Sequence, residues 1–210
     1  MSLISRERLQ ELFKYNPQQS IDEIEVLIDR LSNNGELGTI LELGIGTGGT
    51  LKIWEQLLPQ NKNSLIISID IQPNVEWVYE NSFVDIRVIK GSTNDHSVRQ
   101  GVKDILNGRK VDFLFIDTRH WNDAVKEDLL DYGGFVRDNG IIALHDIAFF
   151  HSYWDKLTWE HPIGKDNIPY HAYEPVKEKT VFHKEEIKTR FGIGILWKMP
   201  NQNVVKFKEI

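Results

Sequence analysis

The 210-residue sequence contains no cysteine. Without thiols the chain cannot form disulfides, use a thiolate nucleophile or hold zinc through Cys ligands. No run approaches the roughly 20 apolar residues that a membrane-spanning helix needs. The first ten residues include Arg6, Glu7 and Arg8 and lack the apolar stretch of a signal peptide. These absences favour a cytoplasmic protein that makes no contact with a membrane.

A basic excess is also missing. The sequence has 25 Lys and Arg residues against 31 Asp and Glu residues, for a formal net charge of −6. Most basic residues stand beside acids, as in Lys126-Glu127-Asp128, which is typical of solvated helix faces. Nucleic-acid binders usually present a basic face. We therefore expect a small-molecule partner and no nucleic acid, while the sequence leaves a homo-oligomer open.

The length suits a single domain over residues 1–210, with room for a substantial core. Residues 1–36 are predicted to form a helical extension. Ser20 precedes Glu23 by three positions, which is the spacing of a capping box, and apolar residues follow at helical intervals. The sequence Asn33-Asn34-Gly35 is a typical helix end.

Beyond this extension, short apolar runs alternate with helical or polar stretches. The runs show no polar alternation, which is typical of parallel strands buried on both faces of a sheet. We therefore predict a doubly wound, Rossmann-like α/β sheet. Its expected strands cover residues 39–45, 64–71, 86–89, 111–116 and 141–144, with a closing strand at 193–198.

Residues from about 150 to 190 do not follow this rhythm. They are rich in histidine and aromatic side chains, and we predict a lid or substrate-binding region. A helix is expected near residues 150–160, followed by a long irregular segment with one strand. Trp154, Trp159 and Tyr170 are candidates for lining an acceptor pocket, although core or lid packing explains them equally well.

The strongest local signal is a glycine-rich turn after the first predicted strand. Gly44, Gly46, Gly48 and Gly49 fall within six residues, and glycines at such a turn let the backbone approach a ligand closely. Gly44, Gly46 and Gly49 also satisfy the dinucleotide fingerprint G-x-G-x-x-G. Asp70 ends the second predicted strand, where a carboxylate can accept the hydroxyls of a ribose. The turn alone is therefore compatible with either NAD or S-adenosylmethionine (SAM).

Glu42 favours SAM. It stands two residues before the first glycine of the turn, where a carboxylate suits the ammonium group of SAM. The same charge beside the pyrophosphate of NAD would be unfavourable.

The ordered set of motifs resembles the class I SAM-dependent methyltransferases. It is most similar to a group of small-molecule and sugar O-methyltransferases that includes the cephalosporin hydroxylase-like proteins. The matching segments are residues 41–48, 68–71, 90–93, 113–120, 140–147 and 191–195. The resemblance implies SAM as cofactor, held by Glu42, Gly44, Gly46, Gly48, Asp70, Ile71, Ser92 and Asp117.

The same resemblance implies a divalent metal, held by an acid ending the fourth strand and an acidic pair ending the fifth. Asp117 and Asp146 match two of these positions, but His145 stands where an acid is usual. Arg119 likewise replaces the acid that usually precedes His120. Neighbouring parallel strands lie about 4.8 Å apart, so Asp117, His145 and Asp146 could share Mg²⁺ or Mn²⁺.

These residues predict methyl transfer from SAM to the hydroxyl group of a small molecule or sugar. An alcohol needs activation, which a metal or a histidine base can supply, and His145 and His120 are the candidate bases. Two alternatives stay open at this point, an NAD-dependent oxidoreductase and a non-catalytic SAM-binding protein.

Overall fold

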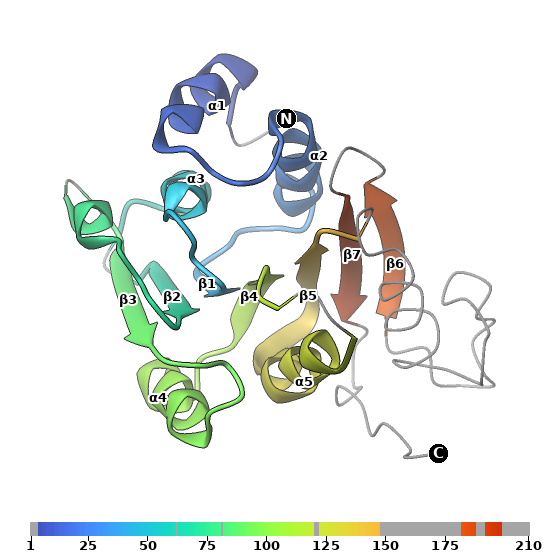
Figure 1. The fold of residues 1–210 in the computed structure, drawn as a ribbon. Helices are drawn as coiled ribbons and strands as arrows, with labels where there is room; N and C mark the ends of the chain where they lie inside the picture. Colours follow the sequence, from blue (N-terminus) through green and yellow to red (C-terminus); the bar gives the residue numbers. More distant parts are fainter. Residues whose placement is uncertain are drawn as a thin grey trace.

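The computed structural model describes residues 4–61, 63–80, 82–119, 122–147, 182–187 and 192–198. They form one seven-stranded sheet with helices on both faces, in the strand order β3-β2-β1-β4-β5-β7-β6 (Figure 1). The strands are β1 (Thr39–Leu43), β2 (Leu65–Asp70), β3 (Asp85–Lys90), β4 (Val111–Ile116), β5 (Val136–His145), β6 (Phe182–Ile187) and β7 (Ile193–Lys198). The α-helices are α1 (Arg6–Leu12), α2 (Ile21–Ser32), α3 (Gly49–Leu57), α4 (His96–Leu106) and α5 (Asn122–Tyr132), with short 3-10 helices at Phe13–Tyr15, Glu76–Tyr79 and Gly133–Phe135.

The first five strands form the predicted parallel sheet. β1 pairs with both β2 and β4, β3 extends the sheet beyond β2, and β5 extends it beyond β4. The reversal of strand order at β1 and β4 leaves a crevice at their carboxyl ends, where sheets of this kind bind ligands. β5 is longer than predicted because it begins at Val136 and passes through polar residues before its apolar part.

Two apolar clusters fill the space between the sheet and its helices. One contains Leu27 of α2 and Trp54 of α3, packed on Phe113 and other side chains of one sheet face. The other contains Val98 of α4, Leu129 of α5 and the residues that point to the opposite face. Burial on both faces explains the continuous apolar strands and confirms the doubly wound fold.

The predicted start of α2 is confirmed by its capping box. The Ser20 side chain accepts a hydrogen bond from the backbone N–H of Glu23, and the Glu23 carboxylate accepts one from the N–H of Ser20. These bonds satisfy donors that a helix start otherwise leaves unpaired. The helix places Ile24 and Leu31 in the core, so the N-terminal extension is part of the packed domain.

The one strand expected between residues 150 and 190 is present as β6, which pairs antiparallel with β7 at the sheet edge. Arg30 of α2 donates to Glu185 of β6, with 2.6 Å between Nη2 and Oε1. The helix expected near 150–160 and the side chains of Trp154, Trp159 and Tyr170 lie outside the described residues.

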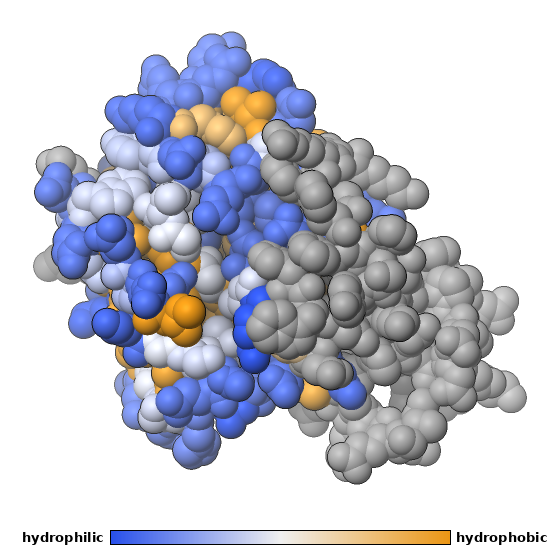
Figure 2. Space-filling model, in the orientation of Figure 1, coloured by the Kyte–Doolittle hydropathy of each residue, from blue (hydrophilic) through white to orange (hydrophobic). Residues whose placement is uncertain are grey.

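None of the described helices is both long and apolar enough to cross a bilayer. Figure 2 shows hydrophilic side chains over much of the described surface on the face drawn, with apolar residues in small patches between them. Ile71 and Tyr79 are the exposed large hydrophobic residues of the described chain.

Candidate active site

A cavity of about 510 Å³ opens at the carboxyl ends of the central strands. Its wall includes the glycine turn after β1, the end of β2 and the residues that follow β3 and β4. Six of the eight residues predicted to hold the cofactor line it, namely Gly44, Gly46, Asp70, Ile71, Ser92 and Asp117. The wall also contains a stretch of the N-terminal segment that the sequence analysis did not single out, Pro17, Gln18 and Gln19.

Gly44 is required by a close approach between two strand ends. Its φ is +87°, and a Cβ there would lie 1.9 Å from the carbonyl oxygen of Asp117. Any side chain would therefore separate the glycine turn from the end of β4.

Asp70 ties the glycine turn to the end of β2. Its Oδ2 accepts hydrogen bonds from the backbone N–H groups of Ile45 at 2.9 Å and Gly46 at 3.2 Å. Its Oδ1 accepts from the N–H of Gln72 at 2.8 Å. A carboxylate offers about four acceptor positions, so Asp70 can shape the turn and still accept a ligand hydroxyl.

Glu42 does not line the cavity, contrary to the direct contact with a ligand ammonium expected from the sequence. It is 0% exposed, and its Oε1 accepts hydrogen bonds from Thr50 Oγ1 at 2.6 Å and Trp54 Nε1 at 3.0 Å. Burial raises the pKa of Glu42 to about 8, against the opposing effect of these hydrogen bonds. Because the side chain points into the packed layer between β1 and α3, Glu42 supports the turn from below.

Gly48 is a second departure from the expected cofactor contacts, because it too lies outside the cavity wall. It caps the start of α3 with a φ of +81°, and a Cβ there would lie 2.9 Å from Val75 and 3.0 Å from Val78. The glycine at this position is explained by helix capping and by close packing against the segment after β2.

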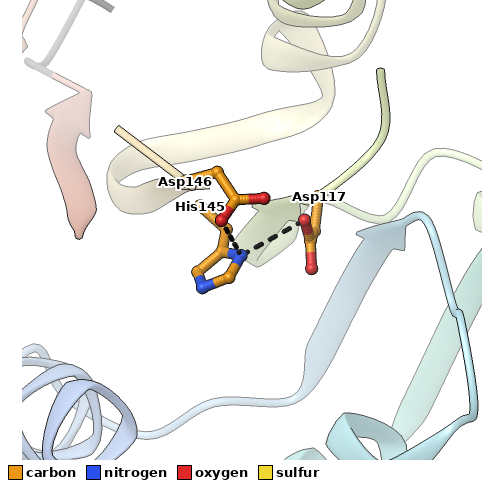
Figure 3. A group of neighbouring side chains, drawn as sticks. All are labelled: Asp117, His145 and Asp146. Carbon is orange, nitrogen blue, oxygen red and sulfur yellow. Dashed lines mark hydrogen bonds and ion pairs between the residues drawn. The ribbon is translucent and has the colours of Figure 1, made fainter. Parts of the chain in front are cut away.

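The ends of β4 and β5 bring Asp117, His145 and Asp146 together (Figure 3). His145 Nδ1 lies 3.3 Å from Asp117 Oδ1 and 3.5 Å from Asp146 Oδ1. Asp146 has a φ of +64°, a left-handed conformation that Asp tolerates better than most residues. This turn of the backbone directs the Asp146 carboxylate back toward His145.

Three carboxylates determine the charge of His145. Burial lowers the pKa of its imidazole, but the neighbouring carboxylates of Asp117, Asp146 and Glu23 outweigh burial and raise the pKa to about 11. The three carboxylates therefore favour the protonated imidazole, which offsets part of their charge. A protonated imidazole cannot accept a proton, so this arrangement disfavours His145 as a metal-free general base. The other candidate base, His120, lies outside the described residues.

The same three residues fit a divalent cation. They offer ligand atoms that all lie within 4.8 Å of one another, and the donor set would be two carboxylate oxygens and one imidazole nitrogen. Oxygen donors suit Mg²⁺ or Mn²⁺, and the imidazole shifts the preference toward Mn²⁺. A bound cation would replace the imidazole proton in holding the two aspartates together.

The start of α2 contributes two polar residues that the sequence analysis missed. Gln19 Nε2 donates to Asp117 Oδ2 at 2.6 Å. Glu23 is fully buried, accepts from the backbone N–H of Gly192 at 2.6 Å and approaches His145 Nε2 to 3.8 Å. The only signal for this placement was a capping-box Glu in a helix that had to be buried, which indicates the helix start and not its partners.

Comparison with known proteins shows which family the chain belongs to. A family described as a methyltransferase domain matches residues 41–147, just over half of the chain, and the chain belongs to that family. A search of curated proteins found no match.

Similar solved structures include the MycE methyltransferase of the mycinamycin biosynthetic pathway in complex with Mg and S-adenosylhomocysteine (SAH), at 17% identity and a TM-score of 0.59. That alignment covers 92% of this chain and 54% of the MycE chain. A MycE complex with Mg, SAH and mycinamycin VI aligns at 18% identity and a TM-score of 0.55, over 91% and 53% of the two chains. This chain thus spans little more than half the length of MycE. The predicted class I SAM-dependent methyltransferase fold is confirmed, and the oxidoreductase alternative has no support.

Proposed function

We propose that this protein transfers the methyl group of SAM to a hydroxyl group of a small molecule, with sugars as the favoured substrate class. The observation that carries the proposal is the position of Asp117. Its carboxylate belongs both to the cavity wall and to the cluster with His145 and Asp146. A cofactor in the cavity and an acceptor at the cluster would therefore meet at this residue.

The rest of the cavity suits the nucleoside part of SAM. Asp70 offers carboxylate oxygens for ribose hydroxyls, and Ser92 lies in the wall formed after β3. Ile71 lines the cavity although its side chain is 65% exposed. A flat adenine ring packed on Ile71 would remove that apolar surface from water, which is favourable.

The acceptor hydroxyl must lose its proton, which passes to water, as its oxygen attacks the methyl carbon. The new C–O bond forms while the C–S bond of the sulfonium breaks, and SAH leaves as a neutral thioether. Asp117, His145 and Asp146 would hold a divalent cation, which lowers the pKa of a bound hydroxyl when present. The protein itself contributes the alignment, since Gln19 orients Asp117 and the capped start of α2 keeps Glu23 beside His145.

The acceptor class rests on likeness to the solved structures. MycE has been crystallised with Mg, SAH and mycinamycin VI. The end of this chain's cavity at Asp117 is polar, with Gln19, Asp117 and Thr118 in the wall. Polar walls suit a hydroxyl-rich acceptor better than an apolar one.

The test is conversion of SAM to SAH with a panel of sugars and hydroxylated small molecules. Activity should disappear after EDTA treatment and return with Mn²⁺ or Mg²⁺, Mn²⁺ restoring more. Asp117→Asn and Asp146→Asn should lose at least a hundredfold in turnover, while Asp104→Asn on the exposed surface of α4 serves as the matched control. Full activity after chelation would refute the metal role, and SAM binding without turnover on any acceptor would favour a non-catalytic binding protein.

A further inference from the structure

The amide of Gln19 occupies an unusual place for a residue next to a helix cap. Gln19 directly precedes Ser20, the N-cap of α2. Its side chain lines the cavity, yet the residue is only 5% exposed. A glutamine is rarely so buried without a polar role.

The contact with Asp117 fixes the orientation of the Gln19 amide. The distance from Gln19 Nε2 to Asp117 Oδ2 is 2.6 Å. A carboxylate only accepts hydrogen bonds, so the NH₂ group must face Asp117 and the amide oxygen must face elsewhere. The orientation of Oε1 therefore follows from chemistry.

The other half of the amide lacks a protein partner. Gln19 Oε1 is buried, and within the described part of the chain no hydrogen-bond donor reaches it. A buried acceptor without a donor is unfavourable, and native structures keep few of them. Because the side chain lines the cavity, a bound ligand can supply the missing donor.

The charge around Gln19 selects the kind of donor. Asp117 is hydrogen-bonded to the same amide, so at this end of the cavity a carboxylate lies beside the buried, unpaired amide oxygen. The basic wall residue Arg119 lies near acids of its own, with Nη2 3.4 Å from Glu127 and 3.9 Å from Asp128. An acceptor next to a negative charge suits a cationic N–H donor. Glu42, another carboxyl near the glycine turn, is buried and already bonded to Thr50.

We propose that Gln19 Oε1 accepts a hydrogen bond from the ammonium group of the methyl donor, which makes Gln19 a specificity residue for the amino-acid end of SAM. This inference rests on the proposed function, because it requires SAM in the cavity. It assigns to the N-terminal segment a binding role that the motifs of the central sheet do not contain.

The fold holds Gln19 in place before any ligand arrives. Thr47 Oγ1 in the glycine turn donates to the carbonyl oxygen of Asn16 at 2.7 Å. A Cβ on Gly49 would lie 2.4 Å from the nitrogen of Pro17, so the two segments are in tight contact. Tyr15 stacks on Trp77 with 5.0 Å between ring centroids. The segment before Gln19 is thus fastened to the cofactor turn, and the amide is preorganised.

The test compares two probes by isothermal titration calorimetry. SAH carries the ammonium group, whereas 5′-methylthioadenosine has the same nucleoside and thioether but no amino acid. Gln19→Met keeps the length of the side chain and removes the amide. We expect it to weaken SAH binding about tenfold or more, the scale of a hydrogen bond to a charged group, and to leave methylthioadenosine binding unchanged.

Two further variants make the comparison specific. Gln19→Glu keeps an acceptor at the same position but loses the N–H donor to Asp117. It should therefore retain the preference for SAH over methylthioadenosine, whatever its absolute affinity for either probe. Gln100→Met changes an exposed glutamine of α4 and should alter neither affinity. Thermal unfolding of each variant reports folding, and Gln19→Ala provides the same test if Gln19→Met does not fold.

Each outcome decides the inference. Equal loss of both probes in Gln19→Met would show that Gln19 acts through cavity shape, and unchanged SAH binding would show that it does not touch the ammonium group. Either result overturns the proposal, as does a wild-type protein that does not prefer SAH. If the wild-type protein binds neither probe, the proposed function itself fails, which separates the two failures.

Discussion

The glycine turn after β1 and the segment that leads into α2 both line the same cavity, but they reach it in different ways. The residues of the turn themselves determine its conformation, because Gly44 permits a contact with Asp117 that any side chain would block. The α2 segment has no such motif, and Gln19 reaches Asp117 across 98 positions of sequence. Local backbone conformation forms the wall at the glycine turn, whereas tertiary packing places the α2 segment in the other wall.

The largest expected effect comes from a substitution in the glycine turn. Gly44→Ala would place a methyl group against the Asp117 carbonyl at a positive φ, which combines overpacking with backbone strain. We expect a loss of about 3 kcal/mol or more in the free energy of unfolding and no measurable SAH binding. Chemical denaturation and calorimetry measure the two effects.

Gly108→Ala is the control for this substitution. Gly108 has a φ of +84° but open space around its Cβ position, so it should lose only the backbone term of about 1–2 kcal/mol. Equal losses at the two positions would contradict the close-approach argument for Gly44.

The next largest effect concerns Glu42, the buried acid that supports the glycine turn. Burial raises the pKa of Glu42 from 4.5 to about 8. Between these values the unfolded chain releases the proton while the folded protein keeps it, so the folded state binds more protons and stability falls as pH rises. The contribution of Glu42 is full below pH 4.5 and lost as pH rises through 8, a change on the order of a few kcal/mol.

Glu42→Gln should remove this decrease in stability with rising pH. Relative to wild type, the variant should gain stability progressively from pH 5 to pH 8.5 in urea titrations. Its SAH affinity should change less than about threefold, because the carboxyl does not line the cavity. A large drop in SAH affinity would restore the direct contact that the sequence suggested.

Asp70→Ala tests the contact between the end of β2 and the glycine turn. It removes an acceptor for ribose hydroxyls and also releases the N–H groups of Ile45 and Gly46. We expect SAH binding to weaken by about 1.5–3 kcal/mol, the scale of hydrogen bonds to a charged group. Circular dichroism should show an intact fold, and unchanged affinity in a folded variant would refute the cofactor role of Asp70.

The smallest effect lies at the sheet edge. Arg30 and Glu185 pair between α2 and β6, and both side chains are about one-third exposed. Arg30→Ala should cost no more than about 1 kcal/mol in the free energy of unfolding and leave SAH binding unchanged. A larger loss would show that β6 helps to hold the α2 wall of the site.

Much of the central sheet was predictable because its signals are local. Strand β4 was predicted at its observed bounds, and the turns after β1 and β2 were located by Gly44 and Asp70. Strand β6 was the harder case. It lies at an edge and pairs only with β7 in the described structure, so it lacks the apolar run that two-sided burial imposes on a central strand.

The candidate site divides in the same way. Asp117, His145 and Asp146 were predicted together because parallel strands end at one edge of the sheet, and the structure places them within reach of one ion. Glu42 was expected to contact the ligand directly, but its distance from Gly44 along the chain does not reveal that its carboxyl points into the layer below α3. Gln19 and Glu23 were missed because nothing near them in the sequence indicates a contact with Asp117 or His145.

The sequence by itself determined the doubly wound sheet, the glycine turn and the acids at the strand ends, since periodicity and turn chemistry act over a few neighbouring residues. The tertiary structure alone decided which buried carboxyl supports the cavity from below and which amide enters its wall. Those roles depend on how α2 packs against the glycine turn and on the ends of β4, β5 and β7. Such packing is set by the shape and burial of many distant side chains together.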